Sequence, residues 1–149
     1  MQQAENPLYD VIIVGGSFSG LSAALGVARA MFKVLVIDSG ERCNKNVIEA
    51  HNFLTHDGAA PADVAAKARA EVSKYKNVEF LNGRVVSAAK KGMIFEVITE
   101  AKEKFTARKL LFTTGLKDKI HQFLVWLNAG VEVLFIVPSV TGMNCVDNP

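Results

Sequence analysis

Residues 9–20 read YDVIIVGGSFSG, a short apolar run that breaks into a cluster of glycines. Within this stretch, residues 11–14 are all β-branched, which is the composition of a strand core. The glycines that follow predict a tight turn, and a helix is expected to begin near Phe18. The stretch therefore predicts the strand, turn and helix that open a β-α-β unit.

A second strand that ends on an acid follows this helix. Residues 33–37 read KVLVI, a second strand, and Asp38 at its end stands eighteen residues after Gly20. A strand, a glycine turn, a helix and a strand-ending acid together are far more specific for dinucleotide binding than glycines alone. The alternative is a glycine-rich turn with no ligand, and the acid disfavours it.

Each of these residues has a physical role in such a unit. Gly15 can take the tight turn where a Cβ would obstruct the chain, and Gly20 lets the helix pack closely on the sheet. The free N–H groups of the helix would face a pyrophosphate, and Asp38 would accept hydrogen bonds from an adenosine ribose. The middle glycine of GxGxxG is replaced by Ser17, a small residue whose hydroxyl can itself bond a phosphate.

Composition limits the other classes of function. The chain has 149 residues, 50% of them hydrophobic, which suits one domain with a substantial core. A net charge of +2, with scattered Lys and Arg, gives no electrostatic case for nucleic acid. No signal peptide is apparent. Cys43 and Cys145 fit neither CxxC nor zinc spacing, so we expect no metal site and a cytoplasmic location.

The remaining sequence predicts helices, strands and one long loop. Helices are expected over 18–31 and from Pro61 to about 75, and the polar connection 39–58 is long enough to be functional. Strands are expected over 78–81, 84–89, 93–99, 104–109 and 110–114, the last of them buried. The middle three read as an antiparallel meander. A meander inserted between parallel strands is expected of an FAD-binding domain rather than a plain NAD domain.

On these residues the chain resembles the thioredoxin-reductase-like oxidoreductases of the pyridine nucleotide-disulfide class. The resemblance runs from Tyr9 to about Ile120 and rests on VIIVGGSFSGLSAA, VLVIDSG, HNFLTHDG, VEFLNGRVV and LLFTTG, in that order. It implies a partial, truncated FAD/NAD(P)-binding domain over 1–120. The implied fold is α/β and Rossmann-like, a parallel sheet with an inserted antiparallel β-meander.

The resemblance also implies residues that would bind FAD at the glycine turn. Those lining the pyrophosphate would be Gly15, Ser17, Phe18, Ser19 and Gly20. Asp38 would hold the adenosine ribose, and Thr114 with Gly115 would close the pyrophosphate side.

Four further positions are implied outside the turn. Arg42 and Asn44 would run along the flavin phosphates, although Arg42 reads equally well as a solvated loop charge. Asn52 would lie near the isoalloxazine and the ribityl chain, and Val86 would pair its backbone with the adenine. The two histidines of HNFLTHDG, His51 and His56, are expected to form hydrogen bonds within the loop rather than to act as acid or base groups.

Three features of the family cannot be found in the chain: a second, NADPH-binding glycine fingerprint, a CxxC that exchanges electrons with the flavin, and the returning C-terminal segment. We therefore expect FAD as cofactor, no catalytic residue, and no nucleic-acid or membrane partner.

In the intact relative, electrons would pass from NADPH to FAD to a disulfide or small oxidised substrate, and a homodimer is allowed. The alternatives are a non-catalytic dinucleotide-binding fragment and, disfavoured by the meander and HNFLTHDG, a dehydrogenase NAD domain.

The last segment, 121–149, resembles nothing in the family. Relatives continue after the strand ending in TG toward a segment that contains ECWG and CPxC. Read from the third base of His121 onward, the permitted codons can spell Pro-Ile-Pro. From Leu124 to Cys145 they can then spell GLAECWGxSxxHCPxCHGYEL. We interpret the tail as a frameshifted reading of that redox segment. The apolar part of the tail, 123–140, suggests a membrane span, but Asn128 and Glu132 interrupt it. We instead expect the tail to pack loosely on the sheet edge that the missing C-terminal strand would leave open.

Overall fold

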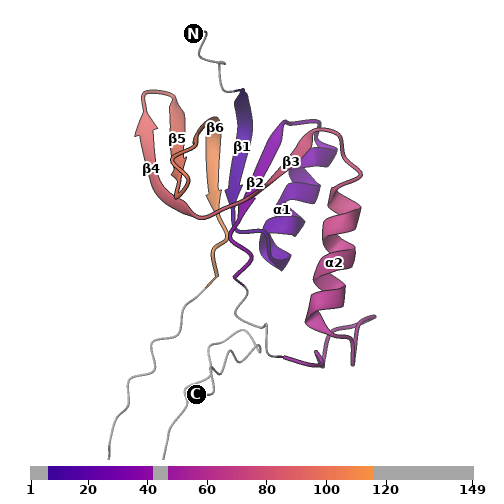
Figure 1. Cartoon of the computed structure of the whole chain (residues 1–149). Helices are drawn as coiled ribbons and strands as arrows, with labels where there is room; N and C mark the ends of the chain where they lie inside the picture. Colours follow the sequence, from indigo (N-terminus) through magenta and orange to yellow (C-terminus); the bar gives the residue numbers. More distant parts are fainter. Residues whose placement is uncertain (1–6, 42–46, 116–149) are drawn as a thin grey trace, which may run out of the picture.

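The computed structural model describes residues 7–41 and 47–115, in which strands and helices alternate before a run of strands (Figure 1). In chain order the elements are β1 (Leu8–Val14), α1 (Phe18–Arg29), β2 (Val34–Asp38), α2 (Pro61–Val72), β3 (Val78–Asn82), β4 (Val85–Lys91), β5 (Ile94–Thr99) and β6 (Lys104–Phe112). Both predicted helices are present, and each ends two or three residues earlier than expected.

One six-stranded sheet contains all the strands, in the order β3-β2-β1-β6-β5-β4. The strands β3, β2, β1 and β6 are parallel, whereas β6, β5 and β4 form an antiparallel meander. Figure 1 shows α1 and α2 packed beside the parallel strands while the meander curls away from them. The predicted fold class, a parallel sheet with an inserted meander, is confirmed.

The expectation of two separate strands over 104–109 and 110–114 was wrong. The structure has one nine-residue strand, β6, because its sequence KFTARKLLF contains no glycine or proline that would end a strand. Its first half pairs with β5, and from Thr106 onward it pairs with β1. The end of this strand is not buried either: Phe112 is 58% exposed, because the pairing with β5 stops at Ala107.

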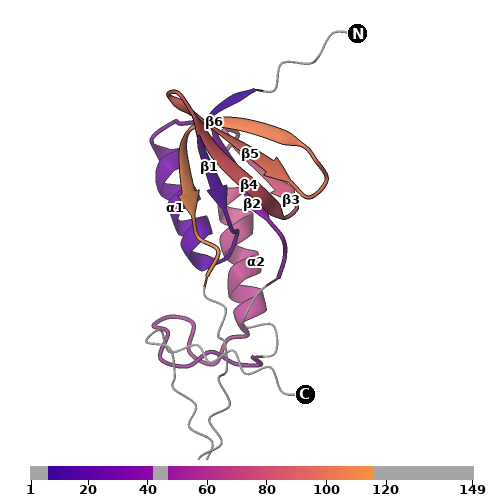
Figure 2. The ribbon, with the colours of Figure 1, turned by 90° about the vertical axis from the view of Figure 1, so that its left-hand side faces the viewer.

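The sheet buries apolar side chains on both faces. Under α1 and α2 the fully buried residues are Ile13, Leu21, Ala24, Val34, Val36 and Val72. On the other face, where the meander folds over the sheet (Figure 2), the buried residues are Tyr9, Ile12, Val14, Leu35, Ile37, Val97 and Ala107. Because the parallel strands are covered on both faces, their carboxyl ends are held in fixed positions.

A polar cluster fixes the opposite, N-terminal ends of these strands. The hydroxyl of Tyr9, a residue that is 2% exposed, donates a 2.6 Å hydrogen bond to Glu79 Oε2. Lys33 Nζ lies 3.3 Å from Glu79 Oε1 and 4.9 Å from the centre of the Tyr9 ring. The Tyr9 hydrogen bond lowers the pKa of Glu79, and burial, reinforced by Glu79, raises the pKa of Tyr9.

Tyr9→Phe is expected to lower the free energy of unfolding by about 1 kcal/mol. The expected loss is this small because the Glu79 side chain is 49% exposed, and solvent screens its interaction with Tyr9. Since folding lowers one pKa and raises the other, the loss should be full between the ordinary values of 4.5 for Glu79 and 10.0 for Tyr9. It should shrink as the pH falls through the pKa of folded Glu79, and as the pH rises above 10.0 toward that of folded Tyr9.

Urea unfolding across pH measures this effect, and Tyr75→Phe is the matched control. The Tyr75 hydroxyl makes no hydrogen bond within residues 7–41 and 47–115, so its removal should change little at any pH. A loss for Tyr9→Phe that stays constant from acid to alkali would contradict the ionic character of the Tyr9–Glu79 bond.

Candidate functional site

The glycine turn between β1 and α1 is packed so closely that side chains cannot enter it. Gly15 has φ +106°, and a Cβ there would overlap the carbonyl oxygen of Thr113. A Cβ on Gly20 would overlap the carbonyl oxygen of Gly15 and lie 2.8 Å from Thr113 Oγ1. A Cβ on Gly16 would lie 2.8 Å from Asp38 Cβ. The turn therefore needs glycine for both conformation and space.

Thr113, which sequence reasoning missed, locks this turn to the end of β6. Its hydroxyl donates to the carbonyl oxygens of Val14 at 3.0 Å and Gly15 at 2.8 Å. Its backbone N–H donates to the Val14 oxygen at 2.8 Å. The sequence-predicted Thr114 and Gly115 come next along the chain, and both are exposed. The only sequence signal for Thr113 is its place directly before them.

The N-terminus of α1 offers unoccupied donors to an anion. Ser17 is the N-cap, yet its side chain makes no capping hydrogen bond, and the first turn carries no acidic residue. The first backbone N–H groups of a helix have no partner within the helix and lie at the positive end of its dipole. Ser17, Phe18 and Ser19 therefore present N–H groups where a phosphate can bind.

Asp38 ends β2 directly beside the turn, as the sequence predicts. Its side chain is 16% exposed, and its carbonyl oxygen accepts a 2.9 Å hydrogen bond from the Gly83 N–H. Arg69 on α2 places Nη1 3.9 Å from Asp38 Oδ2, and its guanidinium lies 4.3 Å from the centre of the Phe80 ring. Nothing in the sequence pattern singled out Arg69, because its partner lies on a different element.

The loop HNFLTHDG lies against the start of α1. The rings of Phe53 and Phe18 meet edge to face, with centroids 6.4 Å apart, and Phe53 also contacts the His56 ring at 5.3 Å. Asn52 has φ +61°, and its N–H donates a 2.8 Å hydrogen bond to Asp57 Oδ1. The loop also holds Thr55 at φ +72°, an unusual conformation for a β-branched residue. The structure thus brings the loop of Asn52 to the glycine turn.

Val86 lies at a bulge in the meander. Val85 pairs with Thr99 and Ser87 pairs with Ile98, so the residue between them has no partner in the register. Val86 is 58% exposed. The other two predicted positions, Arg42 and Asn44, lie outside the described residues.

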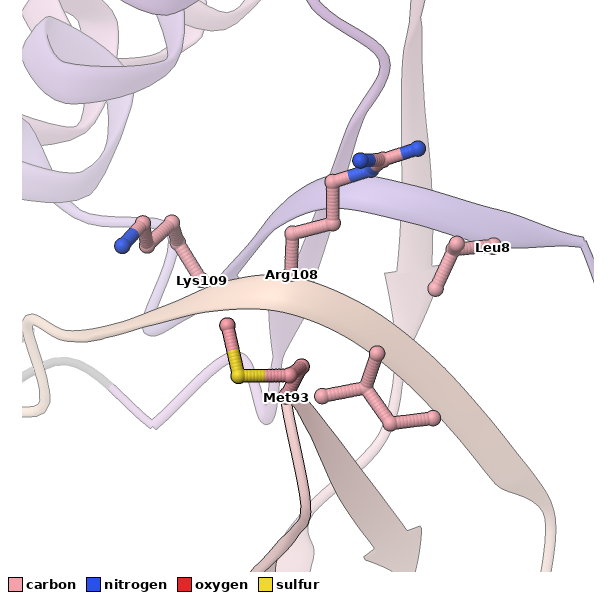
Figure 3. Close-up of a pocket in the computed structure, with 5 residues that line it drawn as sticks. Leu8, Met93, Arg108 and Lys109 are labelled. Carbon is pink, nitrogen blue, oxygen red and sulfur yellow. The ribbon is translucent and has the colours of Figure 1, made fainter.

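A shallow hollow at the far end of the sheet is separate from this site. Its lining consists of Leu8, Met93, Ile94, Arg108 and Lys109 (Figure 3). It contains none of the sequence-predicted residues. In the described ranges, no group of His, Cys, Asp or Glu could hold a metal ion. Among the helices that the structure describes, none has the length and apolarity needed to cross a bilayer.

The structure brings together the glycine turn, Asp38 and Thr113, which lie at the carboxyl ends of β1, β2 and β6 respectively. From β1 the chain builds outward through β2 and β3, then returns to place β6 on the other side of β1. Ligands of open α/β sheets bind at such a reversal, outside the carboxyl ends of the strands. The glycine turn, Asp38 and Thr113 occupy this position.

Comparisons with known proteins agree with this geometry. The sequence profile of the pyridine nucleotide-disulphide oxidoreductases matches residues 9–134. Thioredoxin reductase tcpT of Claviceps purpurea is 37% identical over 114 residues, which cover 74% of this chain and 36% of the relative. The crystal structure of an oxidoreductase from Agrobacterium tumefaciens matches with a TM-score of 0.75 and 37% identity, over 78% of this chain and 39% of that one.

A thioredoxin reductase from Streptococcus pyogenes matches with a TM-score of 0.72 and 28% identity, over 79% of this chain and 39% of that one. The chain therefore spans less than half the length of each of these relatives. The family match over residues 9–134 includes the glycine turn and the six-stranded α/β unit and runs beyond them.

Proposed function

The chain belongs to the pyridine nucleotide-disulphide oxidoreductase family, and from this premise we propose that it binds FAD, as the FAD-binding portion of a thioredoxin-reductase-like flavoprotein. The observation that carries the proposal is the closed glycine turn beside an uncapped helix N-terminus and a strand-ending acid. A cradle with no room for side chains lets the backbone approach a pyrophosphate directly.

The residues present fit FAD along most of its length. The N–H groups of Ser17, Phe18 and Ser19 would bind the pyrophosphate, between glycines that leave it room. Asp38 would accept hydrogen bonds from the adenosine ribose, and the backbone of Val86, at the bulge in β4, would pair with the adenine. Thr114 and Gly115 would close the pyrophosphate side, and Asn52 would lie near the isoalloxazine and the ribityl chain. Arg42 and Asn44 are proposed along the flavin phosphates on sequence alone.

When bound, FAD supplies the electron-transfer chemistry, and the protein supplies binding, orientation and electrostatics. The described residues hold and orient a dinucleotide, and we assign none of them to catalysis. In the intact relative we propose transfer from NADPH through the flavin to a disulfide or a small oxidised substrate. Binding of NAD(P)H and a homodimeric assembly are proposed for that relative only. We also propose a cytoplasmic location, because Cys43 and Cys145 fit neither CxxC nor zinc spacing in the sequence.

The alternative function is a dinucleotide-binding fragment without redox activity. The 149-residue chain, loaded with FAD, is expected to show no NADPH-dependent reduction of a small disulfide, because the sequence contains no CxxC and no second glycine fingerprint. Stopped-flow absorbance would follow NADPH loss, with a full-length thioredoxin reductase as positive control. Turnover near ordinary enzyme rates, about 1 s⁻¹ or faster, would refute the claim that this sequence lacks the redox centre.

We further propose that residues 121–149, which lie outside the described residues, are a frameshifted reading of the family's redox segment. The support is the codon overlap, since few amino acids are permitted at each shifted position. The nucleotide sequence of the gene decides it. Codons from His121 onward that spell CPxC in the shifted frame would support the proposal, and codons that cannot spell it would refute it.

A further inference from the structure

The loop 50–59, which leads into α2, is closed on itself. A β-bridge between Ala50 and Ala59 joins its two ends, and the Ala50 N–H donates a 2.9 Å hydrogen bond to the Ala59 oxygen. Inside the loop, the His56 N–H donates a 2.8 Å hydrogen bond to the Phe53 oxygen. A loop whose ends are close and which carries its own hydrogen bonds behaves as one unit rather than as an extended connection.

An aromatic contact attaches this loop to the first turn of α1. The Phe53 ring meets the Phe18 ring edge to face, with centroids 6.4 Å apart, which is a favourable arrangement of two aromatic rings. The His56 ring lies 5.3 Å from Phe53 and is tilted by 30°. The Thr55 hydroxyl and His56 Nδ1 are hydrogen-bonded at 2.9 Å, which holds the His56 ring in place. Phe53 therefore contacts one ring of its own loop and one ring of the helix.

The closed form of the loop is only weakly favoured by the rest of its structure. Asn52 and Thr55 lie at φ +61° and φ +72°, in the left-handed region that non-glycine residues adopt only where other contacts offset the cost. Little of the loop is buried, since Phe53 is 41% exposed and Leu54 is 88% exposed. Such a loop opens readily, so one aromatic contact changes the balance between its open and closed forms.

The place of this contact connects the loop to the nucleotide site. Phe18 is the first residue of α1 and follows Ser17, the N-cap whose side chain makes no capping hydrogen bond. Figure 2 shows the loop below the two helices, at the end of the sheet where α1 begins. A phosphate bound at the first N–H groups of α1 would lie next to the residue that Phe53 contacts.

We propose that Phe53 is a positioning residue whose contact with Phe18 keeps the loop 50–59 closed beside the bound dinucleotide and so sets the rate at which the site releases FAD. The inference rests on the proposed FAD-binding function. Release requires the loop to open, so a weaker contact raises the open fraction and the dissociation rate constant in proportion. Association changes little, because FAD enters through the open form.

The first test measures FAD dissociation from the full chain, followed by flavin fluorescence after rapid dilution. Phe53→Leu keeps an apolar side chain but removes the ring. It should raise the dissociation rate constant by about three- to tenfold, the range expected for one aromatic pair, and change the association rate constant by less than about twofold. Leu54→Ala is the matched control, because this neighbouring side chain is 88% exposed and should change neither rate constant.

A double-mutant cycle identifies the partner of Phe53. Phe18→Leu should raise the dissociation rate constant by a similar factor, and the double variant should release FAD no faster than the faster single variant. Urea unfolding of the FAD-free Phe53→Leu chain should match the wild type, since the loop is mostly exposed. Multiplied effects in the double variant, or a loss of stability that accounts for the faster release, would overturn the inference.

The second test needs no FAD. Chymotrypsin cleaves after phenylalanine and leucine, so Phe53 and Leu54 report opening of the loop. The FAD-free Phe18→Leu chain keeps the loop sequence intact and should be cut at these two residues about three- to tenfold faster than the wild type. Phe32→Leu is the control, because Phe32 follows the other end of α1. Fragment masses identify the bond that is cut.

The outcomes separate the inference from the proposed function. If the wild type does not bind FAD, both are wrong, whatever the rate at which the loop is cut. If it binds FAD and Phe53→Leu releases FAD at the wild-type rate, the inference alone is overturned. Unchanged cutting of the loop in the Phe18→Leu chain would also overturn the inference alone, because the contact would then not hold the loop closed.

Discussion

Gly20→Ala is expected to abolish FAD binding and to lower the free energy of unfolding by about 3 kcal/mol. The new methyl group would overlap the Gly15 carbonyl oxygen and lie 2.8 Å from Thr113 Oγ1. Neither neighbour can move alone, since the Thr113 hydroxyl is hydrogen-bonded to that same carbonyl oxygen at 2.8 Å. Relief would require α1 to shift away from the sheet, which would displace its first N–H groups from the pyrophosphate.

The same helix provides the matched control. Gly26 has nothing within 4 Å of the position that a Cβ would take, so Gly26→Ala has room. This substitution should leave FAD binding unchanged and stabilise the helix by about 0.5–1 kcal/mol, the difference in helix propensity. Urea unfolding and FAD titration of both variants give the comparison. A Gly20→Ala variant that unfolds and binds like the wild type would contradict the close packing of the turn.

Thr113→Val is expected to destabilise the fold by about 1–3 kcal/mol and to weaken FAD binding by roughly tenfold. Valine has nearly the same shape, so the change removes the hydroxyl without leaving a cavity. The Gly15 carbonyl oxygen loses its 2.8 Å donor, whereas the Val14 oxygen keeps the backbone N–H of residue 113. The turn then loses the contact that fixes it to β6, so binding should fall along with stability.

Thr106→Val is the control for this change, because it lies on the same strand and its hydroxyl has no hydrogen bond in the described part of the chain. Its effect on stability should stay within about 0.5 kcal/mol. Equal effects of the two substitutions, measured by urea unfolding and FAD titration, would show that the Thr113 hydroxyl has no special role.

Features encoded by local patterns could be predicted from the sequence. The β-branched run before the glycines gave β1, the small and apolar residues at helical spacing gave α1, and the acid ending the next strand was placed beside the turn. The meander followed from short strands separated by polar turns. These signals are local because strand and helix periodicities are properties of neighbouring residues.

Features that depend on contacts between distant residues could not be predicted. Thr113 bonds residues 98 and 99 positions away, and Arg69 reaches an acid on another element. The continuity of β6 was missed because its two halves pair with different strands, and that pairing leaves no mark in the local sequence. The roles expected of Asn52 and Val86 stay predictions.

Titration of the purified 149-residue chain with FAD is the most direct test of the proposed cofactor. The expected result is a yellow complex with one equivalent of FAD bound, seen as a flavin absorption spectrum that stays with the protein through gel filtration. The Gly20→Ala chain should remain colourless under the same conditions. A wild-type chain that stays colourless with FAD and binds NADH instead would contradict the assignment of this fold as an FAD-binding unit.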